Sequence, residues 1–170
     1  MIDLAIRGGV VVDGTGAEPR RADVGILDGR LVEVAEGVEA AEELDATGKV
    51  VAPGFVDIHS HSDFTLLVDP RASSAVHQGV TTEVVGNCGF GCFPLLNHEL
   101  APKAIYGHSG DVPLTWTTAA EYFERLQEAR PAINVASLAP NGQIRLSVVG
   151  LEDRPARPDE LARMRYLLDE

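Results

Sequence analysis

The feature that most constrains the fold of this chain is the alternation of strand and helix patterns that starts near residue 50. Apolar, β-branched runs typical of buried strands lie at 51–58, 80–85 and 133–138. Helical patterns are expected at 69–77, at 118–130 and from Pro158 onward. Strands that alternate with helices predict a parallel sheet with right-handed crossovers, either doubly wound or closed as a barrel.

Three segments of this region carry more detailed predictions. Thr118 and Glu121, which stand three residues apart before an apolar helical face, form a capping box that predicts the start of a helix. The run 51–58 lacks the alternation of a half-exposed strand, so we expect it to be buried on both faces. Residues 140–142 are interpreted as a loop, and a short apolar run then ends at Gly150.

Residues 1–50 differ from the rest, because short apolar runs are separated here by glycine turns. Asp28–Gly29 lies between two such runs and predicts a type I′ hairpin, since both turn positions need a positive φ. Gly8–Gly9 is interpreted as another turn, which gives a small antiparallel sheet. The acidic segment 36–45 is interpreted as a solvated connection to a second domain, 51–170.

The chain is acidic, with 26 Asp and Glu residues against 14 Lys and Arg residues and a formal net charge of −12. Such a charge repels phosphate backbones and anionic lipid surfaces, so neither nucleic acid nor a membrane is expected as a partner. No apolar stretch approaches the ~20 residues that cross a bilayer, and the N-terminal MIDLAIRGG carries no targeting pattern. We therefore expect a cytoplasmic protein with small-molecule partners.

Two histidines follow the first buried run. His59 and His61 are two residues apart on a predicted strand, so their imidazoles are expected on one face, where both can bind one divalent cation. Asp57 and Asp63 flank the pair and can orient the imidazoles or bind metal themselves. A pair of hydrogen-bonded histidines at a strand end is the alternative.

Cys88 comes shortly after the second buried run. Neighbouring parallel strands place their carboxyl ends side by side, so a thiolate here can complete or bridge a metal site. A small buried hydrophobe is the alternative for a free cysteine. Cys92 is expected to be buried, and a redox pair with Cys88 is disfavoured because the spacing is not Cys-x-x-Cys. The remaining histidines are expected in loops or on the surface: His77, His98 and His108.

Several stretches together resemble the amidohydrolase superfamily and, within it, the N-acyl-D-amino-acid deacylase (D-aminoacylase) family. The matching stretches include DLAIRGGVVVDGTG, VVAPGFVDIHSHSD, QGVTTEVVGNCG and INVASLAPNGQIR, and the resemblance covers essentially the whole chain. It implies an α/β fold in which a (β/α)₈ barrel carries a small β-sandwich built from both chain ends. Residues 1–50 would belong to the sandwich, and residues 51–170 would form the first βα units of the barrel.

The resemblance also implies a zinc site. His59 and His61 match the metal-binding histidine pair of the family, and Cys88 matches its zinc-ligating cysteine. Asp57 and Asp63 are expected to support these ligands. In the family, Zn²⁺ activates a water that attacks the amide carbonyl of an N-acyl-D-amino acid, and a carboxylate acts first as base and then as acid.

The chain departs from the family pattern in two places. The two further metal histidines and the catalytic aspartate come from later barrel strands, and the sequence stops at Glu170 before them, so no catalytic residue is assigned. A barrel needs roughly 200 residues or more, so we expect an incomplete barrel that is inactive alone or that a second polypeptide completes. Pro140–Asn141 replaces a histidine often found before Arg145, which affects the substrate pocket more than the metal pair.

Two other functions remain open at this point. Cyclic-amide hydrolases such as hydantoinase and dihydroorotase share the histidine pair, but they generally use a bridging lysine where this chain has Cys88. The chain could instead be a non-catalytic, metal-binding fragment of a split or truncated enzyme.

Overall fold

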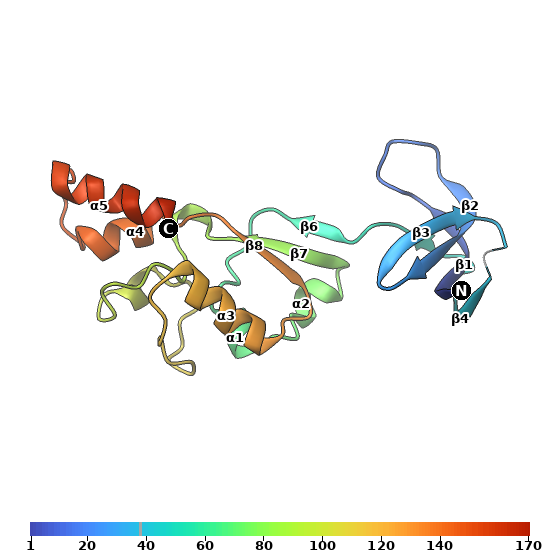
Figure 1. Cartoon of the computed structure of the whole chain (residues 1–170), viewed down its shortest axis with the longest axis horizontal. Helices are drawn as coiled ribbons and strands as arrows, with labels where there is room; N and C mark the ends of the chain where they lie inside the picture. Colours follow the sequence, from blue (N-terminus) through green and yellow to red (C-terminus); the bar gives the residue numbers. More distant parts are fainter. Residues whose placement is uncertain (38) are drawn as a thin grey trace. The chain divides into compact units, whose positions relative to one another are not determined.

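The computed structural model describes residues 1–37 and 39–170 (Figure 1). The chain forms two compact units, Met1–Pro53 and Gly54–Glu170. Each unit has its own sheet and its own apolar core. Among the described residues, no helix is both long enough and apolar enough to span a bilayer.

The first unit is a mixed sheet in the strand order β3-β2-β1-β4, with β5 beside β1. Its strands are β1 (Ile2–Val11), β2 (Arg20–Leu27), β3 (Arg30–Ala35), β4 (Ala40–Asp45) and β5 (Val50–Val51). β2 is antiparallel to both β1 and β3, whereas β4 and β5 run parallel to β1. The expectation of a purely antiparallel sheet is therefore wrong, because β4 and β5 return to β1 without a hairpin.

Of the two turns predicted in this unit one is confirmed, and the prediction for the acidic segment is wrong for residues 40–45. The hairpin at Asp28–Gly29 is confirmed, with φ of 50° and 70°. Gly8–Gly9 is not a turn, because β1 runs through it with a bulge that shifts the register after Ile6. Residues 40–45 form β4 rather than a connection; their side chains are largely exposed, but their backbone pairs with β1. Val38, in the same acidic segment, lies outside the described residues.

The second unit contains a three-stranded parallel sheet in the order β6-β7-β8, as the alternating pattern predicts. Its strands are β6 (Phe55–Asp57), β7 (Val80–Val85) and β8 (Asn134–Ser137). Its helices are α1 (Thr65–Val68), α2 (Ser73–Val76), α3 (Ala119–Ala129), α4 (Asn141–Val148) and α5 (Pro158–Asp169), with 3₁₀ turns η1 (Asn87–Gly89) and η2 (Ala101–Ala104). The described residues close no barrel.

Three predictions for this unit need correction. The run 51–58 is not one buried strand, because Val51 ends β5 and only 55–57 form the short strand β6. Phe55 in β6 is 62% exposed, because β6 pairs with β7 alone among the described strands. Of the helix expected at 69–77 only the short α2 forms, and α1 lies before this range. Ala72 at the N-cap of α2 has a left-handed φ of 46°, which separates the two helices. Residues 141–148 form α4 instead of a loop and an apolar run; this helix has no side-chain cap that could mark its start in the sequence.

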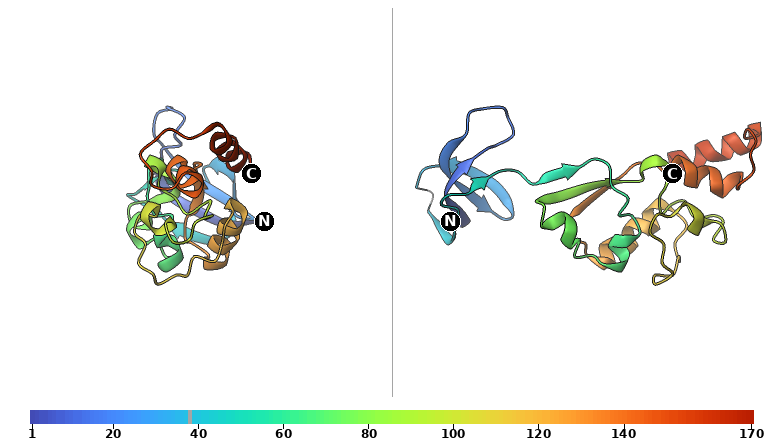
Figure 2. Two further views of the ribbon diagram at one scale, coloured as in Figure 1. Left: turned by 90° about the vertical axis from the view of Figure 1, so that its left-hand side faces the viewer. Right: turned by 180° about the vertical axis from the view of Figure 1, so that it is seen from behind.

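Helices α1, α2 and α3 lie on one side of the three-stranded sheet in both views (Figures 1 and 2). The predicted capping box of Thr118 and Glu121 is present at the start of α3. This helix contributes Tyr122 and Leu126 to the main core, where they pack with residues from α1 and the long loop. Burial of such side chains contributes about 2 kcal/mol each. This core therefore packs α3 against α1 and the long loop.

Candidate metal centre

The two histidines lie in the loop that follows β6. The expectation that they belong to the strand is wrong, because β6 ends at Asp57 and the chain then bends over the end of β7. Ser60 N donates a hydrogen bond to Val84 O at 3.0 Å, and this bond holds the bend. The rings of His59 and His61 still lie together, with centroids 5.4 Å apart.

Cys88 lies in a tight turn, Gly86–Gly89, directly after β7. Gly86 and Cys88 both have left-handed backbone conformations, with φ of 77° and 56°. A side chain at Gly86 would collide with the carbonyl group of Leu138 at the end of β8, so only glycine fits there. The turn leaves Cys88 exposed at the same end of the sheet as the histidine loop.

The structure brings these three predicted residues together. His59 Nε2 lies 3.2 Å from Cys88 Sγ. One ligand atom from each of His59, His61 and Cys88 lies within 4.8 Å of the other two. This is the one cluster of three or more histidine, cysteine or carboxylate ligands that the described part of the chain forms.

The cluster has the chemistry of a zinc site. Two imidazoles and a thiolate are ligands that Zn²⁺ prefers, and ligand atoms around tetrahedral zinc lie roughly 3.5 Å apart. The separation of His59 Nε2 and Cys88 Sγ, 3.2 Å, is close to that spacing. His61 Nδ1 is buried and has no hydrogen-bond partner among the described residues, so one ring nitrogen is left for another ligand. The residues present therefore fit a zinc ion.

The two flanking aspartates hold backbone rather than join the cluster. Asp57 Oδ1 accepts a hydrogen bond from His59 N at 3.0 Å. Asp63 is buried, and its Oδ1 accepts one from Gly86 N at 2.9 Å, which links the histidine loop to the cysteine turn. Burial raises the pKa of the Asp63 carboxyl above its usual value of 3.8. Both aspartates thus fix the positions of ligand-bearing loops.

The other histidines and the second cysteine lie outside the cluster. His77 follows α2, and its Nδ1 lies 2.7 Å from the carbonyl oxygen of Ser73 in that helix. The His108 ring packs against the Phe64 ring, with centroids 4.9 Å apart. His98 is exposed in the long loop. Cys92 is fully buried as predicted, and burial raises the pKa of its thiol. Both cysteines are free thiols.

Two aromatic residues beside the cluster were not predicted. The Tyr106 ring lies 5.1 Å from the His61 ring, and the Phe90 ring lies 6.1 Å from it, centroid to centroid. Tyr106 is 60% exposed, so the rings form an apolar wall open to solvent next to His61. Both come from the long loop 86–114, which has no periodicity that could indicate its path. The only local indication is that Phe90 directly follows the cysteine turn.

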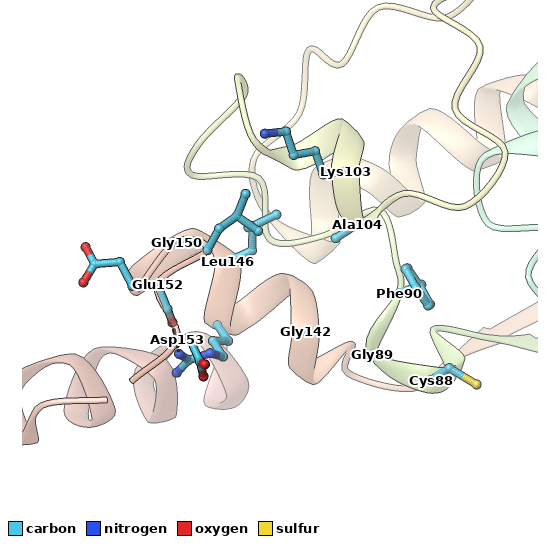
Figure 3. Close-up of a pocket in the computed structure, with 12 residues that line it drawn as sticks. Cys88, Gly89, Phe90, Lys103, Ala104, Gly142, Leu146, Gly150, Glu152 and Asp153 are labelled. Atoms are coloured by element: carbon cyan, nitrogen blue, oxygen red, sulfur yellow. Dashed lines mark hydrogen bonds between the residues drawn. The ribbon is translucent and has the colours of Figure 1, made fainter. Parts of the chain in front are cut away.

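An open hollow of about 410 Å³ borders the cysteine turn, between η1, η2 and α4 (Figure 3). Cys88 lies at one end and Glu152 at the other, and the Cys88 sulfur points away from α4. Arg145 lines the hollow, but its Nη2 donates to Glu152 O at 2.8 Å and to Arg154 O at 2.7 Å. The hollow therefore borders Cys88, and its Arg145 holds the loop after α4.

A parallel α/β sheet with two histidines and a cysteine close together at the carboxyl ends of its strands is typical of metal-dependent hydrolases. A family model described as "Amidohydrolase family" matches residues 42–170. The chain belongs to this family.

Three of the proteins similar to this chain carry deacylase or aminoacylase names. The chain is 39% identical to the N-acyl-D-glutamate deacylase of Alcaligenes xylosoxydans xylosoxydans over 99% of its own length. It is 36% identical to the N-acyl-D-glutamate deacylase of Bordetella bronchiseptica, solved with zinc and a phosphonate inhibitor, with a TM-score of 0.85 over 98% of this chain. A D-aminoacylase structure gives 34% identity and a TM-score of 0.87 over 99% of this chain. The chain spans 35% of the first two proteins and 36% of the third.

Proposed function

We propose that His59, His61 and Cys88 bind Zn²⁺, and that the protein hydrolyses the linear amide bond of N-acyl-D-amino acids. The observation that carries the proposal is the convergence of three ligand atoms within 4.8 Å, from loops that follow two neighbouring parallel strands. The zinc bound by the Bordetella relative and the deacylase names of the similar proteins support it.

The residues of this chain have separate tasks in that reaction. When bound, Zn²⁺ supplies Lewis-acid activation of water for attack on the amide carbonyl. His59 and His61 bind as neutral imidazoles, Cys88 binds as a thiolate, and Asp57 and Asp63 hold the loops that carry them. The described residues place no carboxylate oxygen in the cluster, so we assign the general base to residues outside it.

Cys88 is the residue that favours a linear over a cyclic amide. Cyclic-amide hydrolases that share the histidine pair generally have a lysine as the bridging ligand, and the thiol of Cys88 lies 3.2 Å from His59 Nε2 instead. The matches to deacylases cover 99% of the chain, whereas a dihydroorotase from Solibacter usitatus matches 34% of it.

Zinc content measured after dialysis tests the metal ligands. We expect wild-type chain to retain Zn²⁺, and His59→Ala, His61→Ala and Cys88→Ala to bind it at least about tenfold more weakly, because each removes one ligand. The control His77→Ala removes an imidazole outside the cluster and should retain zinc. Absence of zinc from the wild type, or unchanged binding in all three variants, would refute the site.

The reaction is tested by the release of D-amino acid from N-acetyl-D-amino acids. The 170-residue chain alone should show no turnover, because its cluster lacks a base, and turnover should appear when further strands are supplied in one longer chain or as a second polypeptide. If the protein hydrolysed dihydroorotate or hydantoin rather than N-acetyl-D-amino acids, its reaction would be that of a cyclic-amide hydrolase.

A further inference from the structure

Asn87 occupies the junction between the two ligand-bearing loops. It precedes Cys88 in the chain and is buried, with 7% of its surface exposed. Its side-chain Nδ2 donates hydrogen bonds to Val84 O at 2.7 Å and to Ser60 O at 3.3 Å. Val84 belongs to β7, whereas Ser60 stands between the two histidines. One amide group therefore connects the strand that leads to the cysteine with the loop that carries the imidazoles.

The backbone of Asn87 closes the cysteine turn as well. Its carbonyl oxygen accepts a hydrogen bond from Phe90 N at 2.9 Å, across a Cys88 residue whose φ is 56°. The same residue thus holds the left-handed turn on one side and the histidine loop on the other. Both side-chain contacts are to carbonyl oxygens, so they need a neutral group with two N–H donors, which a carboxamide supplies.

We propose that Asn87 is a positioning residue for the metal centre. Its side-chain amide holds the histidine loop against the end of β7 and so sets the spacing between His59 Nε2 and Cys88 Sγ, which is 3.2 Å. This inference rests on the proposed metal centre, and Asn87 itself contacts neither metal nor substrate in it.

The loop keeps other attachments when the amide is removed. Ser60 N still donates to Val84 O at 3.0 Å, and Gly86 N still donates to Asp63 Oδ1 at 2.9 Å. Loss of the Asn87 amide should therefore loosen the spacing of the ligands without releasing the loop. Groups that orient metal ligands typically change metal affinity about 10- to 100-fold when they are lost, and we expect a change in that range.

The test is a Co²⁺ titration of the full chain, which reports affinity and, through the thiolate-to-cobalt absorption band, the contact with Cys88. Asn87→Leu removes both donors and keeps the number and branching of the side-chain heavy atoms. The matched control is Asn134→Leu, which removes a side-chain hydrogen bond to Thr81 O, of 3.2 Å, at the other end of the same sheet. We expect Asn87→Leu to bind Co²⁺ about 10- to 100-fold more weakly with a weaker thiolate band, and Asn134→Leu to match the wild type.

The outcomes separate this inference from the proposed function. Unchanged affinity and an unchanged thiolate band in Asn87→Leu would overturn the positioning role alone. A wild-type chain that binds no Co²⁺ would overturn the metal centre itself. If circular dichroism shows that Asn87→Leu is unfolded, NMR of the wild type decides: the Asn87 side-chain amide protons should exchange more slowly than those of the exposed Asn97, and equal rates would overturn the proposal.

Discussion

The backbone conformation of Cys88 and its neighbours determines where the Cys88 thiol lies. Cys88 is a non-glycine residue in the left-handed region, with φ of 56°, a conformation that costs an L-residue about 1–2 kcal/mol. The neighbouring hydrogen bonds, from Phe90 N to Asn87 O and from Gly86 N to Asp63 Oδ1, hold the turn in this shape. The exposed Cys88 and the buried Cys92 are four residues apart, and this turn explains why only the first reaches the histidines.

Gly86→Ala tests this turn at the scale of one residue. Alanine at φ of 77° is strained, and its methyl group would also lie 2.9 Å from Ser137 Oγ. We expect a loss of unfolding free energy of about 2–4 kcal/mol, measured by chemical denaturation. Gly110→Ala is the control, because Gly110 has φ of 79° and no atom within 4 Å of an added methyl, so only the strain of about 1–2 kcal/mol should appear. Equal losses in the two variants would contradict the close packing at Gly86.

At the scale of elements, the start of α5 is held by an ion pair with the loop that connects it to α4. Arg154 donates from Nη1 and Nη2 to the two carboxylate oxygens of Glu160, at 2.7 and 2.8 Å, and Arg157 N donates to the same carboxylate at 2.8 Å. These contacts, with the Arg154 side chain first, lower the pKa of Glu160 from its usual 4.5 to about 2. The charged carboxylate therefore holds the first turn of α5.

The stabilisation by Glu160 should depend on pH. Because the folded state has the lower pKa, the contribution is complete above about pH 4.5 and is lost as the pH falls toward 2. Glu160→Gln should thus have a lower melting temperature than the wild type at pH 7, and the difference should shrink below pH 4.5. The control is Glu124→Gln, which changes an exposed glutamate. It should have the melting temperature of the wild type both at pH 7 and below pH 4.5. A difference that stays constant with pH would refute the ion pair.

Elements with strong local patterns could be predicted from the sequence, and elements defined by their partners could not. An apolar run predicts β7, and the capping box predicts the start of α3. Turn chemistry predicts the hairpin at Asp28–Gly29. β4 was missed because its charged side chains face solvent while its backbone pairs with a distant strand. α4 was missed because Pro140 at its N-cap supplies no side-chain cap.

The same division applies to the candidate site. His59 and His61 could be proposed from their two-residue spacing on a predicted strand, and Cys88 from its place just after the next strand. The family resemblance supports all three. Asn87 and Tyr106 could not, because their contacts depend on the course of loops that have no periodic pattern. The sequence therefore indicates the members of the candidate metal cluster better than the residues that surround them.

At the scale of the molecule, the edge of the second sheet is apolar. Among the described strands β6 pairs only with β7, and it exposes 62% of Phe55 and 56% of Val56. Exposed apolar edges promote pairing between chains. We expect the purified chain to self-associate, and Val56→Lys to weaken the association about tenfold, roughly 1.4 kcal/mol, in sedimentation velocity.

The control for the sheet edge is Leu161→Lys, which places the same charge on an exposed position of α5. It should leave self-association unchanged. Equal weakening by both substitutions would mean that the added charge, rather than the edge of β6, is responsible.

The hydrogen bond from Tyr122 Oη to Asp63 O, 2.9 Å long, connects α3 to the histidine loop across 59 residues of sequence. During synthesis on the ribosome, the loop therefore emerges well before the helix that supports it from behind. A metal ion that meets the nascent chain early finds both histidines on a loop without this support. If the loop binds Zn²⁺ as proposed, we therefore expect tight binding only after translation has passed Tyr122 and α3 has docked.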